Sequence, residues 1–252
     1  MAEKYFIWNI DDGLEQDKRI IEILKKYNMG ATFNLNSGLY GDRTYEGRIG
    51  NLGMKEVPYN EFHSARRHFL PYAEHFRIPE EEVVEVYQGF EIASHTLEHR
   101  NLKQCSNAEV REQILTDVSN LSEKFDQKII GFAYPYGVSD QRCVEVLKDA
   151  GIEYARSVKS DPSFRFPEDP YYMPMTCWHN SRKALTLVDS FIEQKVQDED
   201  MFFLMFAHGY EFDFNTRESN WDKFEEICKR VAGKKDILCC STGEAFRRHK
   251  AK

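Results

Sequence analysis

Two aspartates and three histidines of this sequence have the types and positions of active-site residues. Asp11 and Asp12 follow one apolar run, His95 and His99 follow a second, and His208 ends a third. His95 and His99 are four residues apart, so a helical turn after the strand would let both imidazoles bind one metal ion. The five residues therefore predict a metal-binding active site assembled from distant parts of the chain.

Each motif also has an explanation without chemistry. The histidine pair fits a surface or capping pair as well as metal ligands, and the two aspartates fit a helix-capping turn. His208 alone would fit a hydrogen-bonded core histidine. Gly13 favours the active-site interpretation, because the sharp turn that it permits lets two adjacent carboxylates reach different partners.

Apolar runs of strand length alternate with helical patterns, which is typical of βα units around a parallel sheet or barrel. We predict an α/β fold with strands at 5–10, 31–35, 90–94, 129–134, 154–157, 201–207 and 237–239. We predict helices at 17–27, 107–125, 141–150, 184–197 and 221–232. Ser106 and Glu109 form a predicted capping box, and Gly151 marks a helix end.

The residues suited to chemistry follow the carboxyl ends of these strands. In a barrel of parallel strands those ends meet on one face, which is the usual position of an active site. Groups that are far apart in the sequence would therefore converge on one site. The ordered set is stronger evidence than any single motif, because chance would have to place several unrelated residues at equivalent strand ends.

One segment, 39–88, breaks the alternation and shows no clear strand pattern. We interpret the chain as a single catalytic domain, 1–252, with an insertion at about 39–88 that is either a functional lid or a solvent-facing decoration. The histidines of the insertion, His63, His68 and His75, share no ligand-like spacing. We predict that they are surface residues.

Composition narrows the class of protein. The net charge of −8 argues against nucleic-acid and membrane-surface partners, which need a concentrated basic face. No apolar stretch approaches the roughly 20 residues of a membrane span, and the N-terminus has no leader pattern, so we expect a cytoplasmic protein. The six cysteines form no C-x-x-C pair and are predicted to be buried free thiols.

Four runs together resemble the motifs of the polysaccharide deacetylases of the NodB-homology type, carbohydrate esterase family 4. Asn-Ile-Asp-Asp-Gly at 9–13 is similar to their first motif, usually Thr-Phe-Asp-Asp-Gly. Ser-His-Thr-Leu-Glu-His at 94–99 is similar to the second, His-Ser/Thr-x-x-His. Phe-Ala-Tyr-Pro-Tyr-Gly at 132–137 resembles the third motif, and Phe-Ala-His at 206–208 resembles the last.

The resemblance implies a distorted (β/α) barrel of about seven strands that holds one divalent metal ion, most commonly zinc. It implies that Asp12, His95 and His99 bind this ion. Two imidazoles and one carboxylate leave positions on zinc open, which is typical of a catalytic rather than a structural site.

The resemblance also implies the catalytic roles. Asp11 would be the general base, His208 the general acid, and the backbone N–H of Tyr136 a donor to the oxyanion. Water activated by the metal would attack the amide carbonyl, and acetate and a free amine would leave. Tyr210 follows His208 closely, and we predict that it contacts the substrate.

The sequence departs from the family pattern in two motifs. Ala133 stands near the position of a third-motif arginine that holds the catalytic aspartate, so Asp11 is either less tightly oriented or held by another cation. The fourth motif, an Asp/Trp element that supports the catalytic histidine, has only Trp178 as a counterpart.

Three functions are compatible with these residues. The first is removal of N-acetyl groups from a sugar or polysaccharide, the hydrolysis of a non-peptide carbon–nitrogen bond. The second is hydrolysis of a small non-carbohydrate amide on the same scaffold. The third is a catalytically weak carbohydrate-binding homologue; all five predicted residues count against it, and Ala133 counts for it.

Overall fold

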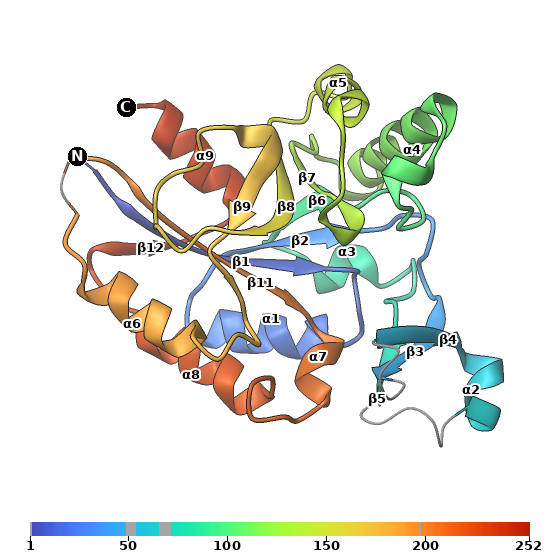
Figure 1. The fold of residues 1–252 in the computed structure, drawn as a ribbon, viewed down its shortest axis with the longest axis horizontal. Coiled ribbons are helices and arrows are strands. Elements are labelled where there is room, and N and C mark those ends of the chain that lie inside the picture. Colours follow the sequence, from blue (N-terminus) through green and yellow to red (C-terminus); the bar gives the residue numbers. More distant parts are fainter. Residues whose placement is uncertain (1, 49–53, 66–71, 197) are drawn as a thin grey trace.

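A large parallel sheet forms the centre of the computed structural model, which describes residues 2–48, 54–65, 72–196 and 198–252. Within these residues the sheet has nine strands, namely β1 (Lys4–Asp11), β2 (Ala31–Leu35), β6 (Glu91–Ser94), β7 (Gly131–Ala133), β8 (Tyr154–Ser160), β9 (Met173–Met175), β10 (Cys177–Trp178), β11 (Met201–His208) and β12 (Ile237–Cys239). Their order is β10-β11-β1-β2-β6-β7-β8-β9, and β12 pairs with β1. The predicted α/β class and distorted (β/α) barrel are confirmed (Figure 1).

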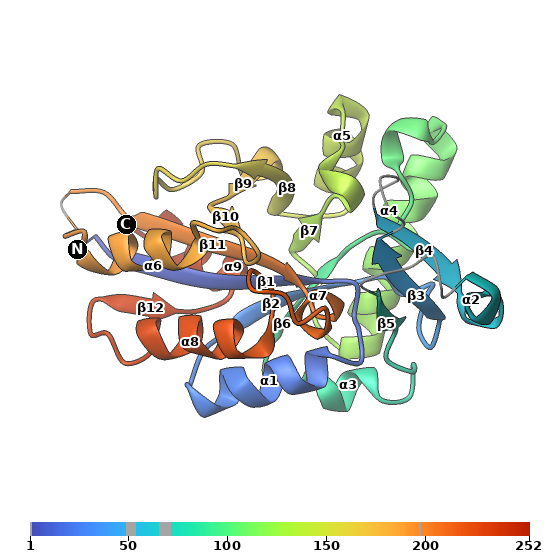
Figure 2. The same ribbon diagram turned by 60° about the horizontal axis from the view of Figure 1, so that its bottom comes forward.

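Helices surround this sheet. They are α1 (Asp17–Lys26), α3 (Val83–Val86), α4 (Asn107–Phe125), α5 (Gln141–Asp149), α6 (Ala184–Glu193), α7 (Tyr210–Asp213), α8 (Trp221–Val231) and α9 (Thr242–Lys250). Figure 1 shows α1, α6 and α8 along one side of the sheet, and Figure 2 shows α1 and α8 below it. The capping box of Ser106 and Glu109 is formed, and Gly151 has the positive φ that a helix end favours.

Strand β1 lies in the middle of the sheet and inside the core. All eight residues of this strand are buried. Its backbone pairs with β11 on one side and with β2 and β12 on the other. Trp8 packs against Phe224 of α8 with ring centroids 4.6 Å apart. A central strand packed in this way holds its carboxyl end, and the aspartates there, in a fixed position.

The sequence prediction missed several strands. Two of them, β9 and β10, have three and two residues, which is too short for a recognisable pattern. The prediction that 39–88 has no clear strand is wrong, because β3 (Arg43–Arg48), β4 (Met54–Pro58) and β5 (Tyr72–Phe76) form an antiparallel sheet in the order β4-β3-β5. We call this the insertion sheet; with α2 (Tyr59–Ala65) it lies beyond the carboxyl ends of β1 and β2 (Figure 1).

Two predictions from composition can be compared with the structure. The six cysteines are free thiols; five are buried, and Cys239 is partly exposed. Among the described residues, no helix has the length and hydrophobicity that crossing a bilayer requires.

Candidate active site

The sheet register brings the predicted residues together. Asp11, at the end of β1, lies opposite His208 at the end of β11 and opposite Asn34 of β2. His95 directly follows β6, and its backbone N–H donates to Leu35 at the end of β2. The carboxyl ends of four neighbouring parallel strands therefore surround one point, as expected for an active site in this fold.

Asp12, His95 and His99 present a set of atoms that fits a metal ion. Oδ1 of Asp12 lies 3.8 Å from Nε2 of His95 and 3.7 Å from Nε2 of His99. The ligand atoms of all three residues lie within 4.8 Å of one another. Oδ1 of Asp12 is also buried without a hydrogen-bond partner among the described residues. A buried carboxylate oxygen needs compensation, and a cation between the two imidazoles would provide it.

The loop after β6 reaches this geometry without the helical turn expected from the histidine spacing. Thr96 and His99 have φ values of 66° and 53°, in the left-handed region. Side-chain hydrogen bonds hold the loop, since Nδ2 of Asn36 donates to the carbonyl oxygens of His95 and Thr96. His99 therefore faces His95 because the loop is folded back, not because the two residues share a helix face.

The three residues have the protonation states that a metal requires. His95 donates its Nδ1–H to the carbonyl oxygen of Ala133 at 2.7 Å, which leaves Nε2 free for an ion. Burial lowers the pKa of His95, and it lowers the pKa of His99 to about 3. Burial alone would raise the pKa of Asp12, but His75, His99 and His208 hold it well below its usual range. Two neutral imidazoles and a carboxylate are thus available.

Arg156 is the cation beside Asp11. Its Nη2 donates to both carboxylate oxygens of Asp11 at 2.7 and 2.5 Å, and its Nε donates to Oδ1 of Asn9 at 2.7 Å. Arg156 is fully buried and is the β8 residue paired with Ala133 of β7. The cation absent at Ala133 is therefore supplied by the adjacent strand. An arginine inside a strand-like run was the available signal, and sequence analysis overlooked it.

Glu211 supports His208. Its Oε2 lies 3.4 Å from Nδ1 of His208 and accepts a hydrogen bond from Nε1 of Trp178 at 2.9 Å. Burial alone would lower the pKa of His208, but Glu211, Asp12 and Asp11 raise it to about 10. Trp178 was the only sequence candidate for this support, and it acts through a carboxylate on α7. The spacing of three residues between His208 and Glu211 was the signal that sequence analysis did not use.

The prediction that His75 is a surface residue is wrong. Only 3% of it is exposed, and its Nε2–H donates to Oδ2 of Asp12 at 3.2 Å. Its Nδ1 lies 3.2 Å from the hydroxyl oxygen of Thr44 on β3. The insertion sheet therefore holds the oxygen of Asp12 that does not face His95 and His99. The same prediction for His63 and His68 falls outside the described side chains.

Two further predicted residues lie at the site in different surroundings. Tyr136 is 61% exposed, has a φ of 58°, and sets its ring edge-on to His99 with centroids 4.8 Å apart. Its N–H lies in the first turn of a short 3-10 helix, where backbone donors have no partner within the helix. Tyr210 is buried between His75 and His208, with ring centroids 5.1 and 5.4 Å away.

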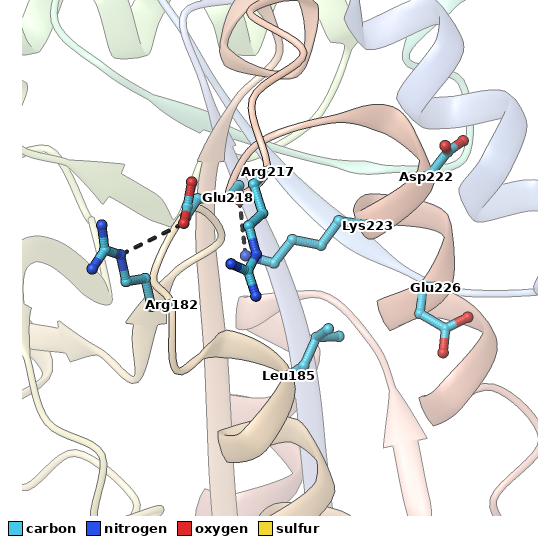
Figure 3. A pocket seen from close by; sticks show the side chains of 7 residues that line it. All are labelled: Arg182, Leu185, Arg217, Glu218, Asp222, Lys223 and Glu226. Carbon is cyan, nitrogen blue, oxygen red and sulfur yellow. Dashed lines mark hydrogen bonds and ion pairs between the residues drawn. The ribbon is translucent and has the colours of Figure 1, made fainter.

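The hollow drawn in Figure 3 lies elsewhere. It is lined by Arg182, Leu185, Arg217, Glu218, Asp222, Lys223 and Glu226. Nε of Arg182 lies 3.5 Å from Glu218, and Nζ of Lys223 donates to the carbonyl oxygens of Ser181 and Glu218. None of the residues predicted for chemistry lines this hollow, so the strand ends remain the candidate site.

The chain is similar to known proteins both in its sequence family and in its fold. The family model for polysaccharide deacetylase matches residues 1–155. The peptidoglycan deacetylase PdaC from Bacillus subtilis is 15% identical with a TM-score of 0.55, and the match covers 99% of this chain and 93% of that one. A family 4 carbohydrate esterase from Streptomyces lividans in complex with acetate is 14% identical with a TM-score of 0.54. This match covers 95% of this chain and 93% of that one.

A CE4 family pseudoenzyme from Bacillus anthracis also matches, at 16% identity and a TM-score of 0.52, over 97% of this chain and 66% of that one. The chain spans 55% of the Streptococcus pyogenes deacetylase PplD. No curated protein sequence matches the chain. Identities this low show a shared fold and leave the activity to be argued from the site.

The pairing of Asp11 with Arg156 can be tested by unfolding in urea. Arg156→Met leaves a buried carboxylate without its cation, so we expect the free energy of unfolding to fall by roughly 3–5 kcal/mol. Asp11→Asn with Arg156→Met should cost clearly less than the sum of the single changes, because neither charge is then unpaired. Strict additivity would contradict the pairing. Arg111→Met, which removes an exposed ion pair with Asp149 at 3.0 Å, is the control and should cost less than about 1 kcal/mol.

Proposed function

The chain belongs to the polysaccharide deacetylase family, whose model matches more than half of it, and from this premise we propose that it is a metal-dependent hydrolase that removes N-acetyl groups from a sugar or polysaccharide. One observation carries the proposal. An oxygen of Asp12 that is buried without a hydrogen-bond partner among the described residues faces Nε2 of His95 and of His99, and the carboxylate of Asp11 and the imidazole of His208 lie beside them. This arrangement offers a cation site, a base and an acid together.

The proposed cofactor is one divalent ion held by Asp12, His95 and His99. Two nitrogen ligands and one oxygen ligand favour zinc over magnesium or calcium, which prefer oxygen ligands. Such an ion polarises an amide carbonyl and lowers the pKa of a water molecule.

The remaining steps belong to the side chains. Asp11 accepts the proton of the attacking water; Arg156 and Asn34 fix its carboxylate, and its Oδ2 lies 3.6 Å from Nε2 of His95. His208 donates a proton to the departing amine, which leaves poorly unless protonated. The hydrogen bond to Glu211 keeps His208 protonated near neutral pH. The Tyr136 N–H is the proposed donor to the developing oxyanion.

A catalytically weak carbohydrate-binding protein is the competing proposal. The sequence argument for it was the absence of an arginine at Ala133, and the presence of a pseudoenzyme among proteins of the same fold keeps it relevant. Arg156 weakens that argument, because Asp11 has its cation despite the changed position. Hydrolysis of a small non-carbohydrate amide remains the other alternative, and its products separate it from deacetylation.

The decisive assay measures acetate release from N-acetylglucosamine oligomers with added zinc. We expect the unchanged protein to release acetate, and Asp11→Asn to lower kcat by at least about 100-fold through loss of the base. Elemental analysis should find about one divalent ion per chain, absent in His95→Ala. Absence of acetate with both proteins, or equal rates, would refute the proposal. Release of ammonia or another acid from small amides would support the alternative hydrolase.

The contact between His75 and Asp12 predicts an effect on metal affinity. His75→Leu removes the hydrogen-bond donor to the Asp12 oxygen that does not face His95 and His99, so the carboxylate loses its orientation. Changes behind a metal ligand typically weaken affinity by about 10- to 100-fold, and we expect this loss in a competition titration with a chromogenic chelator. His249→Leu, the same change at an exposed histidine on α9, is the control and should leave the affinity unchanged.

The pairing of His208 with Glu211 predicts the alkaline side of the pH profile. The negative charge of Glu211 raises the pKa of His208, to about 10, so protonated His208 persists until the pH rises through that value. Removing the charge in Glu211→Gln lowers this pKa towards the ordinary histidine value of about 6.5. The alkaline fall of kcat/KM should therefore begin at lower pH in the variant. An unchanged alkaline limb would show that His208 is not the acid.

A further inference from the structure

Backbone hydrogen bonds hold Arg77 next to the segment that follows Asp11 and Asp12. It directly follows β5 and forms an isolated antiparallel bridge with Leu14. On either side of this bridge, the N–H of Ile78 donates to the carbonyl oxygen of Gly13 at 3.0 Å, and the N–H of Glu15 donates to that of Phe76 at 2.8 Å. The Arg77 backbone therefore runs alongside the turn that follows Asp12.

The side chain of Arg77 belongs to the face of the insertion sheet that meets the site. In an extended segment, residues two apart point to the same side, and His75 on this segment contacts Asp12. The positive charge of Arg77 affects the pKa values of two site residues. It adds to burial in lowering the pKa of His99, and it opposes the rise that burial causes in the pKa of Tyr136.

This guanidinium has no partner among the residues that the structure describes. Arg77 is only 6% exposed, and its Nε is fully buried without a hydrogen bond. Its Nη atoms also lack hydrogen bonds to described residues. Unlike Nε, they are not fully buried, so the outer edge of the guanidinium is accessible to solvent. The carboxylates of Glu46 and Glu56 face His75 instead, at 3.9 and 3.8 Å.

Arg77 differs from Arg156 in its lack of a carboxylate partner among the described residues. Both arginines are buried near the aspartates, but Arg156 donates to both oxygens of Asp11, whereas no carboxylate of the described residues pairs with Arg77. A buried cation without a partner is costly, and the planar guanidinium fork matches the two oxygens of a carboxylate or phosphate. The Nη edge, on the side of the extended segment that also carries His75, is where a substrate would supply such a group.

We propose that Arg77 is an anion subsite, which selects N-acetyl sugars that carry a carboxylate or a phosphate on the same sugar residue as the acetamido group. The proposal rests on the proposed deacetylase function. The subsite comes from the insertion and not from the strand ends, so it concerns selection of substrate rather than bond cleavage. A neutral N-acetyl sugar would leave the guanidinium unpaired in the complex and would bind less well.

The test compares N-acetylglucosamine, its 6-phosphate and the corresponding 6-carboxylate as substrates, by acetate release. We expect the unchanged protein to prefer one or both anionic sugars. Loss of hydrogen bonds between charged groups corresponds to about 10- to 100-fold in affinity, and Arg77→Met should lower kcat/KM by that factor for the anionic sugars only. Arg77→Lys should retain part of the preference. Arg43→Met, which removes an exposed arginine that packs on Phe76 of the same sheet, is the matched control and should keep all of it.

A binding measurement separates failure of the subsite from failure of the proposed function. Calorimetry with the 6-phosphate and the 6-carboxylate on Asp11→Asn, with and without Arg77→Met, reports the subsite without turnover. Acetate release with equal rates for neutral and anionic sugars would overturn the subsite and leave the deacetylase function standing. An equal loss of kcat for all three sugars in Arg77→Met would also overturn it, because Arg77 would then act on the amide. Arginine-dependent binding without acetate release would support the subsite and refute the deacetylase.

Discussion

Two adjacent carboxylates buried at the end of one central strand are the constraint on which the site depends. Side by side in a region of low dielectric, Asp11 and Asp12 can both remain ionised only if each has its own compensation. The backbone separates them, since Asp12 has a φ of 81° and turns away from the strand direction that Asp11 follows. Arg156 and Asn34 then donate hydrogen bonds to Asp11, while Asp12 faces the imidazoles of His75, His95 and His99.

The parts of this arrangement that are local in sequence could be predicted. Strands such as β1, β6 and β11 have patterns that survive without tertiary context, and Asp11, His95 and His208 lie at their carboxyl ends as predicted. The partners of these residues could not be located in the same way. Arg156 reaches Asp11 because β7 pairs with β8 in the register that sets Ala133 opposite Arg156. Such a register depends on packing between strands, which no single segment encodes.

The insertion shows a different reason for failure. One face of its sheet carries an aromatic cluster, in which Tyr45 stacks on Phe62 with centroids 3.8 Å apart, and the other face carries His75, Thr44 and Glu46. Polar residues that face an active site look like solvent-facing residues in a hydrophobicity pattern. His75 was therefore placed on the surface by the reasoning that succeeds elsewhere, because that reasoning cannot distinguish water from a buried ionic site.

A substituted motif residue is thus weak evidence that a charge of this site has lost its compensation. The third-motif arginine matters because it places a positive charge against the carboxylate of Asp11, and the structure provides that charge from the neighbouring strand at 2.7 Å. Likewise, the support expected from a fourth motif is provided by Glu211, three residues beyond His208. Electrostatic compensation is a property of positions in space, so a substituted motif residue argues for a pseudoenzyme only when no other side chain restores the charge. Asp11 and His208 both retain theirs, which is why the site of this chain has the charge distribution of an acid–base hydrolase although its motifs are incomplete.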